Sequence, residues 1–346
     1  MVTIKQIAAE VGISATTVSI VLGGKAEERK ISAATQKKIF ETANRLGYQP
    51  NIAARSLRAG FGADEIRVAM LWAEDFRASM MVRFWDGLRA ELAQLDRKIR
   101  LVIYPYTNDH LDEVHALTSA SDCHAAIICN ASDADLEFLR RTQLAIPVVL
   151  YNRTCPGYCS VNVDDALMGA LAARALSDQG CHRGVVLTGA PVFAGMEVRV
   201  QSFLLEGARH GLEARVAPYC DSSARGGYEG ARALWSAESG EYPDALFCGS
   251  SLIAHGALRA LRELGLPQLP RVVAIGNGAP ELDELSVPSL SVVYLPMEEM
   301  ARECLRLLMD WMSDRLSSPA SRLLEARYIP RESCGPIADQ EQKTID

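Results

Sequence analysis

The segment "ISATTVSIVLGG", residues Ile13 to Gly24, places four hydroxyl side chains on one short apolar stretch and closes it with two glycines. Hydroxyl side chains compete with the backbone inside a helix and fill a protein core poorly. They are well suited to hydrogen bonds with phosphate oxygens and with the edges of bases. A short helix of this composition is therefore expected to face a polar partner.

Two further helices are expected on either side of this segment. Before it, Thr3 and Gln6 have the spacing of a capping box, and Gly12 is a helix terminator. Ser14 is the expected N-cap of the middle helix, and a third helix is expected from Ser32 to Gly47. The side chains at helical apolar spacing are Ile4, Ile7, Ala8, Val11, Val18, Val21, Leu22, Ile39, Ala43 and Leu46. Two helices joined by so tight a turn predict a helix-turn-helix, whose second helix enters the major groove of DNA.

The charge of the chain is distributed unevenly. Residues 1–60 contain nine Lys and Arg against four Glu, whereas the whole chain of 346 residues has a net charge of −7. A small basic head on a large acidic body favours contact of the head alone with a polyanion. Phosphate contacts dominate nucleic-acid affinity, so this charge distribution supports DNA binding by the head.

Length and composition predict a globular protein of two or three domains. No apolar run is long enough to span a bilayer, and the N-terminal stretch has no signal-peptide core, so a cytoplasmic location is expected. The nine cysteines include no CxxC pair, and the closest two are Cys155 and Cys159 in "CPGYC". Buried free thiols are therefore expected rather than disulfides or a metal site.

The segments "VTIKQIAAEVGISATTVSIVL", "ISAATQKKIFETANRLGYQPNIAARSLR" and "RESCG" resemble the LacI/GalR (lactose-repressor) family of bacterial transcription regulators. The resemblance implies that Ala15, Thr16 and Ile20 read bases. It assigns phosphate contacts to Thr3, Ser14, Thr17 and Ser19. Many relatives carry Arg at the position of Ile20, and Ile can read only an apolar group such as a thymine methyl. The alternative is that Ile20 belongs to the core of the head.

Residues 50–64 resemble the hinge helix and linker of this family, which follow a helix-turn-helix domain of residues 1–49. The resemblance implies a hinge helix that orders on DNA, where Leu57 is an apolar wedge in the minor groove. Leu57 could instead pack on the body as a linker residue. The other DNA contacts expected in this region are Tyr48, Asn51, Arg55 and Arg58.

Residues 65–346 alternate short apolar runs such as "IRVAMLW" and "RVVAIG" with helical stretches, which predicts doubly wound parallel α/β sheets. Ligands of such sheets bind beyond the carboxyl ends of the strands. The resemblance implies a periplasmic-binding-protein-like body of two lobes, with three crossovers and a small effector held between them. It also implies a homodimer that binds a palindromic operator and responds allosterically to the effector.

The expected effector-binding residues are drawn from both lobes. They are Trp72, Asp75, Phe76, Met81, Asn152, Arg199, Ser250 and Gly278. Trp72 could equally be a plain core residue, and Asp164 and Asp165 are interpreted as helix-capping residues. Ser250, Gly278 and Leu295 replace polar groups that read sugar hydroxyls in relatives, which indicates a less hydroxylated ligand such as a sugar derivative or a small acid.

No catalytic motif is present, and the six histidines are dispersed, so the chain is not expected to be an enzyme or to need a cofactor. Three alternatives to a DNA-binding transcription regulator stay open. They are a solute-binding protein without a regulatory role, a metabolic enzyme with an unusual N-terminal domain, and a regulator that answers to a protein partner.

Overall fold

The computed structural model describes residues 3–22, 26, 29–46, 65–95, 98–118, 122–142, 144, 146–237, 242–313, 315–316 and 318–337. By their contacts these residues belong to two compact units. The first unit comprises Met1–Ala78, Trp85–Asn162 and Glu299–Arg322, and the second comprises Ser79–Phe84, Val163–Glu298 and Leu323–Asp346. The chain thus passes between the units at the three expected crossovers, and Ser79–Phe84 is a short additional segment of the second unit.

The head consists of three helices, α1 (Ile4–Val11), α2 (Ala15–Leu22) and α3 (Ala33–Arg45). The predicted capping box starts α1, because the Gln6 backbone N–H donates to Thr3 Oγ1 at 3.3 Å and the Thr3 N–H donates to Gln6 Oε1 at 2.8 Å. Gly12 ends α1 in the left-handed conformation, with φ of 78°. The core of the head is made by Ile7, Ala8, Val11, Val18, Val21, Ala26, Ile39 and Ala43.

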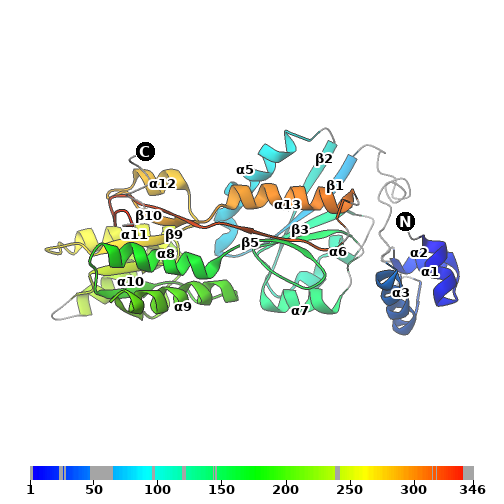
Figure 1. Ribbon diagram of the computed structural model, residues 1–346, viewed down its shortest axis with the longest axis horizontal. Helices are drawn as coiled ribbons and strands as arrows, with labels where there is room; N and C mark the ends of the chain where they lie inside the picture. Colours follow the sequence, from blue (N-terminus) through cyan, green and yellow to red (C-terminus); the bar gives the residue numbers. More distant parts are fainter. Residues whose placement is uncertain are drawn as a thin grey trace. The chain divides into compact units, whose positions relative to one another are not determined.

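The first unit is built on a six-stranded sheet with the order β11-β5-β4-β3-β1-β2. Figure 1 labels β1, β2, β3 and β5 of this sheet. The strands are β1 (Glu65–Ala73), β2 (Lys98–Tyr106), β3 (Ala125–Cys129), β4 (Val148–Tyr151), β5 (Cys159–Val163) and β11 (Ser321–Leu324). The helical segments that accompany them are η1 (Phe76–Met80), α5 (Met81–Leu92), η2 (Leu111–Glu113), α6 (His115–Thr118), α7 (Asp133–Arg141) and α13 (Met297–Met312). β1, β2, β3, β4 and β5 pair in parallel.

The second unit repeats this architecture with the strand order β12-β10-β9-β8-β6-β7. Figure 1 labels β9 and β10 of this sheet. Its strands are β6 (Arg183–Leu187), β7 (Glu213–Val216), β8 (Ala245–Cys248), β9 (Arg271–Gly276), β10 (Ser291–Tyr294) and β12 (Arg327–Ile329). Its helices are α8 (Asp165–Asp178), α9 (Ala194–Arg209), α10 (Ala224–Ala237), α11 (Ser251–Glu263) and α12 (Pro280–Leu285). The pairing is parallel except for β12, which is antiparallel to β10. The prediction of two doubly wound parallel sheets is confirmed.

Glycines set the distance between the helices of the second unit. A Cβ on Gly169 of α8 would lie 2.1 Å from the carbonyl oxygen of Arg199 on α9. A Cβ on Gly256 of α11 would lie 1.8 Å from the carbonyl oxygen of Ala224 on α10. Any larger residue would force these helix pairs apart, so α8 and α9, like α10 and α11, pack with their backbones in close contact.

All nine cysteines are free, and eight of them are buried, as predicted. Burial raises the pKa of the Cys181 thiol to about 12 and that of Cys334 to about 11. The two thiols of "CPGYC", Cys155 and Cys159, are buried as well, and burial raises the pKa of each. These thiols are protonated near neutral pH and therefore behave as small apolar residues.

Among the described residues, no single helix is long and apolar enough to cross a membrane, and only α1 and α2 taken together pass that test. These two helices meet at a bend of 111°.

Candidate functional site

The first candidate interface is the pair of helices α1 and α2. The bend of 111° between them is made within Gly12, Ile13 and Ser14, which is the geometry of a helix-turn-helix. Val18 and Val21 of α2 are fully buried in the head, so the opposite side of this helix remains for a partner.

Of the hydroxyl side chains at the start of α2, that of Ser14 caps the helix and bonds to that of Thr17, and that of Thr16 is exposed. Ser14 is the predicted N-cap, because its Oγ accepts the backbone N–H of Thr17 at 3.0 Å. The Ser14 and Thr17 hydroxyls also lie 2.8 Å apart and share a hydrogen bond. Thr16 is exposed and is free of any role in the core. The helix start is therefore capped, and the exposed side chains of Ser14 and Thr16 carry hydroxyls there. Hydroxyls and free N–H groups at helix starts are common donors to phosphates and base edges.

Ile20 is half-buried, and among the described residues of the head it is not one of the side chains that pack against the core. Ala15, by contrast, does pack against that core. This placement supports an outward role for Ile20 over the alternative of a core residue. The base-reading role of Ala15, Thr16 and Ile20 stays a prediction, as do the phosphate contacts of Ser19.

Thr3 is exposed, and its hydroxyl already donates to Gln6 Oε1 at 3.0 Å. Its contact with a phosphate would therefore compete with the capping box. The remaining predicted DNA contacts lie outside the described residues, as does the hinge helix; they are Tyr48, Asn51, Arg55, Leu57 and Arg58.

The first unit gathers several predicted effector residues at the carboxyl ends of its strands. Trp72 of β1 pairs in register with Cys129 of β3, and Cys129 pairs with Tyr151 of β4. Trp72 is buried and stacks on Tyr151, with ring centroids 6.5 Å apart. Asn152 directly follows β4 and has a positive φ of 51°. Met81, half-buried at the start of α5, belongs instead to the second unit, and the side chain of Phe76 lies outside what the structure describes.

Asp75 is held by two neighbours within the same unit. Arg77, which is buried, donates from Nε to both oxygens of Asp75 at 3.0 and 2.9 Å, and Asn108 donates to Oδ2 at 2.7 Å. Burial raises the pKa of Asp75, but the hydrogen bonds and charge of Arg77 outweigh it and hold that pKa below its ordinary value. Asp75 is thus an ionised, fixed acceptor, and a ligand would meet the Asp75–Arg77 pair as a unit.

Asn130 is a residue of this edge that sequence reasoning missed. It follows β3, has a positive φ of 65° and is buried, and its Nδ2 has no hydrogen-bond partner among the described residues. Because Cys129 and Tyr151 are in register, Asn130 and Asn152 follow adjacent strands at the same level. Two asparagines in left-handed backbone conformation after neighbouring strands are an uncommon arrangement. The strand-end position in "IICNAS" was the only sequence signal for Asn130.

In the second unit, Arg199 is buried on α9 and forms an ion pair with Asp165 on α8. Its Nε and its terminal nitrogen NH2 both lie 2.7 Å from Asp165 Oδ1, and its guanidinium lies 5.7 Å from the centre of the Phe193 ring. The close packing at Gly169 brings these helices near enough for the pair to form. Asp164 is the N-cap of α8 and accepts the Leu167 N–H at 2.9 Å, which confirms the capping interpretation for that residue.

Ser250 and Gly278 lie in the loops after the adjacent strands β8 and β9. Ser250 is buried and is the N-cap of α11, where its Oγ accepts the Ile253 N–H at 3.2 Å. A Cβ on Gly278 would lie 2.9 Å from the Cβ of Ser251, so the two loops are in direct contact. The hydroxyl hydrogen of Ser250 and the backbone of Gly278 are what these positions can offer a ligand. The effector roles predicted for Arg199, Ser250 and Gly278 stay predictions.

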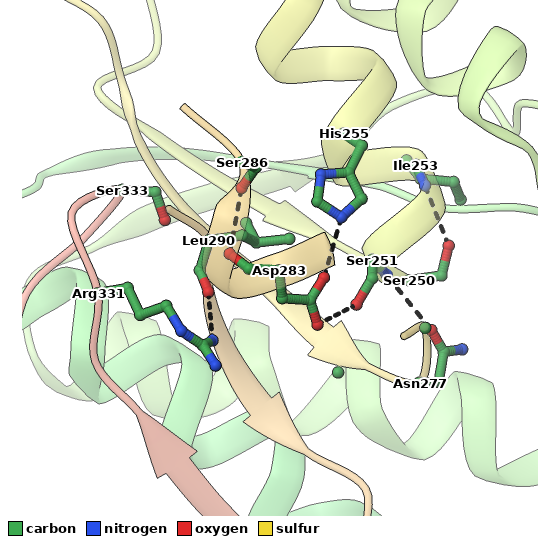
Figure 2. A network of polar contacts seen from close by, with 12 residues as sticks. Ser250, Ser251, Ile253, His255, Asn277, Asp283, Ser286, Leu290, Arg331 and Ser333 are labelled. Atoms are coloured by element: carbon green, nitrogen blue, oxygen red, sulfur yellow. Dashed lines mark hydrogen bonds and ion pairs between the residues drawn. The ribbon is translucent and has the colours of Figure 1, made fainter. Parts of the chain in front are cut away.

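A buried polar network lies beside these two loops (Figure 2). Ser251 Oγ donates to Asp283 Oδ2 at 3.0 Å, and the Ser251 N–H donates to Asn277 Oδ1 at 3.3 Å. Figure 2 shows His255 reaching the other oxygen of Asp283, at 3.0 Å from Nε2. A nucleophilic serine needs a base within hydrogen-bond reach, yet here the carboxylate separates the serine from the histidine, and Ser251 is 1% exposed. The network fixes α12 to the start of α11 and does not form a catalytic triad.

In the described part of the chain, no group of three or more His, Cys, Asp or Glu side chains could hold a metal ion. His110 Nδ1 lies 3.1 Å from Glu113 Oε1, and His210 Nε2 lies 3.4 Å from Glu206 Oε1, both in partly exposed positions. His124 is buried, and its Nδ1 accepts the Arg67 N–H at 2.8 Å.

Comparison with known proteins gives this geometry a context. Residues 3–51 match the family "Bacterial regulatory proteins, lacI family", and residues 173–334 match a "Periplasmic binding protein-like domain". The HTH-type transcriptional regulator AglR of Rhizobium meliloti (strain 1021) is 27% identical over 353 residues, covering 98% of this chain and 96% of that protein. The HTH-type transcriptional repressor PurR of Vibrio cholerae serotype O1 (strain M66-2) is 24% identical over 325 residues, covering 91% of this chain and 93% of that protein.

Among solved structures, a LacI family transcription regulator from Clostridium acetobutylicum is similar with a TM-score of 0.73 and 29% identity. The match covers 77% of this chain and 100% of that chain. These relatives are transcriptional regulators and not enzymes, in agreement with the expectation from the sequence.

Proposed function

Because the chain belongs to the lacI family of bacterial regulatory proteins and is a DNA-binding transcriptional regulator with a ligand-binding domain, we propose that it is a homodimeric repressor of a near-palindromic operator. The observation that carries the proposal is the bent pair α1–α2, whose second helix begins with exposed hydroxyls and leaves Ile20 outside the core. A two-fold operator requires a two-fold protein, so two copies of the head act together.

The recognition helix reads the operator through small and apolar side chains. Ile20 cannot donate a hydrogen bond to guanine, so its contact is with an apolar group, of which the thymine methyl is the one in the major groove. Thr16 can donate to or accept from a base edge, and Ser14, Thr17 and Ser19 contact phosphates. The preferred operator is accordingly rich in A·T pairs at the position that Ile20 reads.

Residues 50–64 act as the hinge. Leu57 enters the minor groove at the centre of the operator and kinks the duplex, and Arg55 and Arg58 contact the groove floor or the phosphates beside it. Tyr48 and Asn51 add phosphate contacts at the end of the head. A regulator that binds chromosomal operators in this way is located in the bacterial cytoplasm and is bound to the nucleoid.

A small metabolite controls this activity. It binds at the carboxyl ends of the strands, where Trp72, Asp75, Asn130 and Asn152 lie in the first unit. In the second unit the contacts come from Arg199, Ser250 and Gly278. The small residues at 250 and 278 favour a ligand with few hydroxyls, such as a sugar derivative or a short acid. Binding changes the equilibrium between DNA-competent and DNA-incompetent states and thereby the formation of the hinge helices.

The first experiment selects fragments of the source genome with purified full-length protein and sequences those that are retained. A shared near-palindrome with a flexible pyrimidine–purine step at its centre is the expected result. Selection with Ile20→Arg provides the matched comparison, because arginine should move the preference at one base pair of each half-site toward guanine. Unspecific retention by the wild type would contradict operator recognition and would favour a binding protein without a regulatory role.

The second experiment addresses the metabolite. A panel of monosaccharides, sugar phosphates and short hydroxy acids is screened by thermal shift, and each compound that shifts the wild type is titrated by calorimetry. We expect Arg199→Ala and Arg199→Lys to abolish binding or weaken it at least tenfold, because neither keeps the planar fork. Arg209→Lys is the control on the same helix, since Arg209 is exposed and, within the described part of the chain, pairs with Glu206 at 3.1 Å. Unchanged affinity in both Arg199 variants would remove this residue from the effector site.

A further inference from the structure

Arg83 in the first turn of α5 is buried, with 7% of its surface exposed, and all five of its N–H groups find acceptors. From the terminal nitrogen NH1 it donates to the carbonyl oxygens of Gly276 at 3.0 Å and Gly278 at 3.2 Å. From NH2 it donates to the carbonyl oxygen of Leu295 at 2.9 Å. The two remaining bonds go to Glu298, from Nε at 2.6 Å and from NH2 at 2.8 Å.

The acceptors of Arg83 all belong to one edge of the second sheet. Gly276 is the last residue of β9 and Gly278 lies two residues beyond it, whereas Leu295 directly follows β10. One guanidinium thus ties together the carboxyl ends of two adjacent parallel strands. This is the edge at which ligands of parallel sheets bind, and it includes the predicted effector position Gly278.

Two further groups hold the guanidinium in this orientation. The ring of Tyr294 lies 4.9 Å from the Arg83 guanidinium, and the Tyr294 hydroxyl donates to Glu298 Oε2 at 2.9 Å. Burial raises the pKa of Glu298, but the hydrogen bonds and charge of Arg83 outweigh it and keep that pKa below its ordinary value. The carboxylate therefore remains ionised and paired, and the arginine has one stable position.

The position of Arg83 in α5 connects the contacts of its guanidinium to that helix. Residues 79–84 are part of the second unit, but α5 continues without a break to Leu92, and from Trp85 onward it is part of the first unit. Arg83 therefore bonds the start of α5 to the ends of β9 and β10.

We propose that Arg83 is a positioning residue of the effector edge, which sets the backbone of the loops after β9 and β10 and makes the first turn of α5 respond to changes in them. The inference rests on the proposed effector function. The two residues whose carbonyl oxygens Arg83 binds in these loops cannot replace it, because Gly278 has no side chain and Leu295 is apolar. A ligand that displaces the carbonyl oxygen of Gly278 or Leu295 must strain or break a hydrogen bond to Arg83, and that displacement is passed to α5.

The test is hydrogen–deuterium exchange of full-length protein with Arg83→Met and Arg83→Lys. We expect amide exchange to rise at least tenfold in peptides that cover 276–279, 294–298 and 81–85, while peptides of α8 and α9 keep their wild-type rates. Arg83→Lys should restore little of the wild-type protection from exchange. A lysine ammonium has three donors and lacks the planar guanidinium that binds the ends of two strands and a carboxylate at once. Arg89→Met on the same helix is the control, since Arg89 is exposed and, among the described residues, forms a surface ion pair with Asp86 at 3.3 Å.

Glu298→Gln is the second variant should Arg83→Met fail to fold, because it removes the carboxylate charge and leaves the three carbonyl bonds in place. It is expected to raise exchange in the same three peptides by a smaller factor. Unchanged exchange in these peptides would overturn the inference, and so would a rise in the two loops without a rise in residues 81–85.

A binding measurement separates positioning from structural support. For each compound of the metabolite panel that shifts the wild type, Arg83→Lys should raise Kd at least tenfold, with Arg89→Met unchanged. Equal affinity for the wild type and Arg83→Lys would overturn the inference. If no compound shifts the wild type, the proposed effector function fails, and the exchange experiment still decides the role of Arg83 in the two loops and in α5.

Discussion

The ion pair between Arg199 and Asp165 can be measured by a double-mutant cycle with Arg199→Met and Asp165→Asn. The two side chains are 8% and 20% exposed, and two nitrogens of the guanidinium reach the same carboxylate oxygen at 2.7 Å. Both substitutions keep roughly the shape of the side chain and remove its charge. The cycle therefore reports the interaction itself and not the loss of packing.

The magnitudes follow from what each variant leaves behind. Asp165→Asn leaves a guanidinium buried on α9 without its carboxylate, and we expect a loss of about 3 kcal/mol, at the lower end for a broken buried pair. Arg199→Met leaves a carboxylate that is partly exposed and lies in the first turn of α8, where the helix dipole favours a negative charge. Its cost should be lower, about 2 kcal/mol, and the coupling between the two sites about 2 kcal/mol.

Unfolding of the second unit can be followed through Trp235, which is the only one of the four tryptophans that belongs to that unit and is buried at 2% exposure. Urea titrations are carried out in a background in which the tryptophans of the first unit, Trp72, Trp85 and Trp311, are replaced by phenylalanine. A coupling energy below about 0.5 kcal/mol would refute the reasoning, because that is the scatter expected for independent sites. It would mean that Arg199 is held by its packing and not by Asp165.

Three other outcomes follow from the described contacts. Thr3→Ala removes the capping box of α1 and should lower the stability of the head by about 1 kcal/mol, measured by thermal unfolding of full-length protein. Glu206 has a pKa below its ordinary value because Arg174 donates to it at 2.7 Å, so its stabilising contribution is present above the pH range in which a free glutamate titrates and disappears as the pH falls. Glu206→Gln should therefore flatten the acid side of the stability profile, and an unchanged slope would contradict this assignment. Gly256→Ala places a methyl 1.8 Å from the carbonyl oxygen of Ala224, and a loss of about 3 kcal/mol in urea unfolding is expected, whereas a neutral effect would disprove the close contact of α10 and α11.

Much of the local structure was readable in the sequence because its causes lie within a few residues. The capping box of Thr3 and Gln6, the left-handed Gly12 and the N-cap Ser14 are interactions between neighbours in the chain, and each is formed as expected. The apolar runs "IRVAMLW" and "RVVAIG" form β1 and β9 as expected, because central strands of a parallel sheet are buried on both faces and must be apolar. The short strand β5 gives no such signal, because the polar residues Ser160 and Asn162 alternate with apolar ones in it.

The candidate site was only partly readable, because its polar groups meet across long stretches of chain. Arg199 and Asp165 were both named from the sequence, but the ion pair between them depends on Gly169, which lets two helices approach within backbone contact. Asn130 carried no signal beyond its place after a strand, and its positive φ appears only in the folded chain.

Arg83 shows most clearly where sequence reasoning stops. In the sequence it is one arginine on an amphipathic helix, where a solvated position is the ordinary expectation. In the fold its guanidinium is buried. It donates hydrogen bonds to carbonyl and carboxylate oxygens of residues that lie about two hundred positions further along the chain. The sequence by itself determined the helices of the head and the long apolar strands, because local periodicity and short-range caps encode them, and its motifs carried the resemblance to the family. Tertiary structure alone decided which charges meet at the strand ends, because a guanidinium is placed by the whole set of carbonyl and carboxylate groups that folding collects around it.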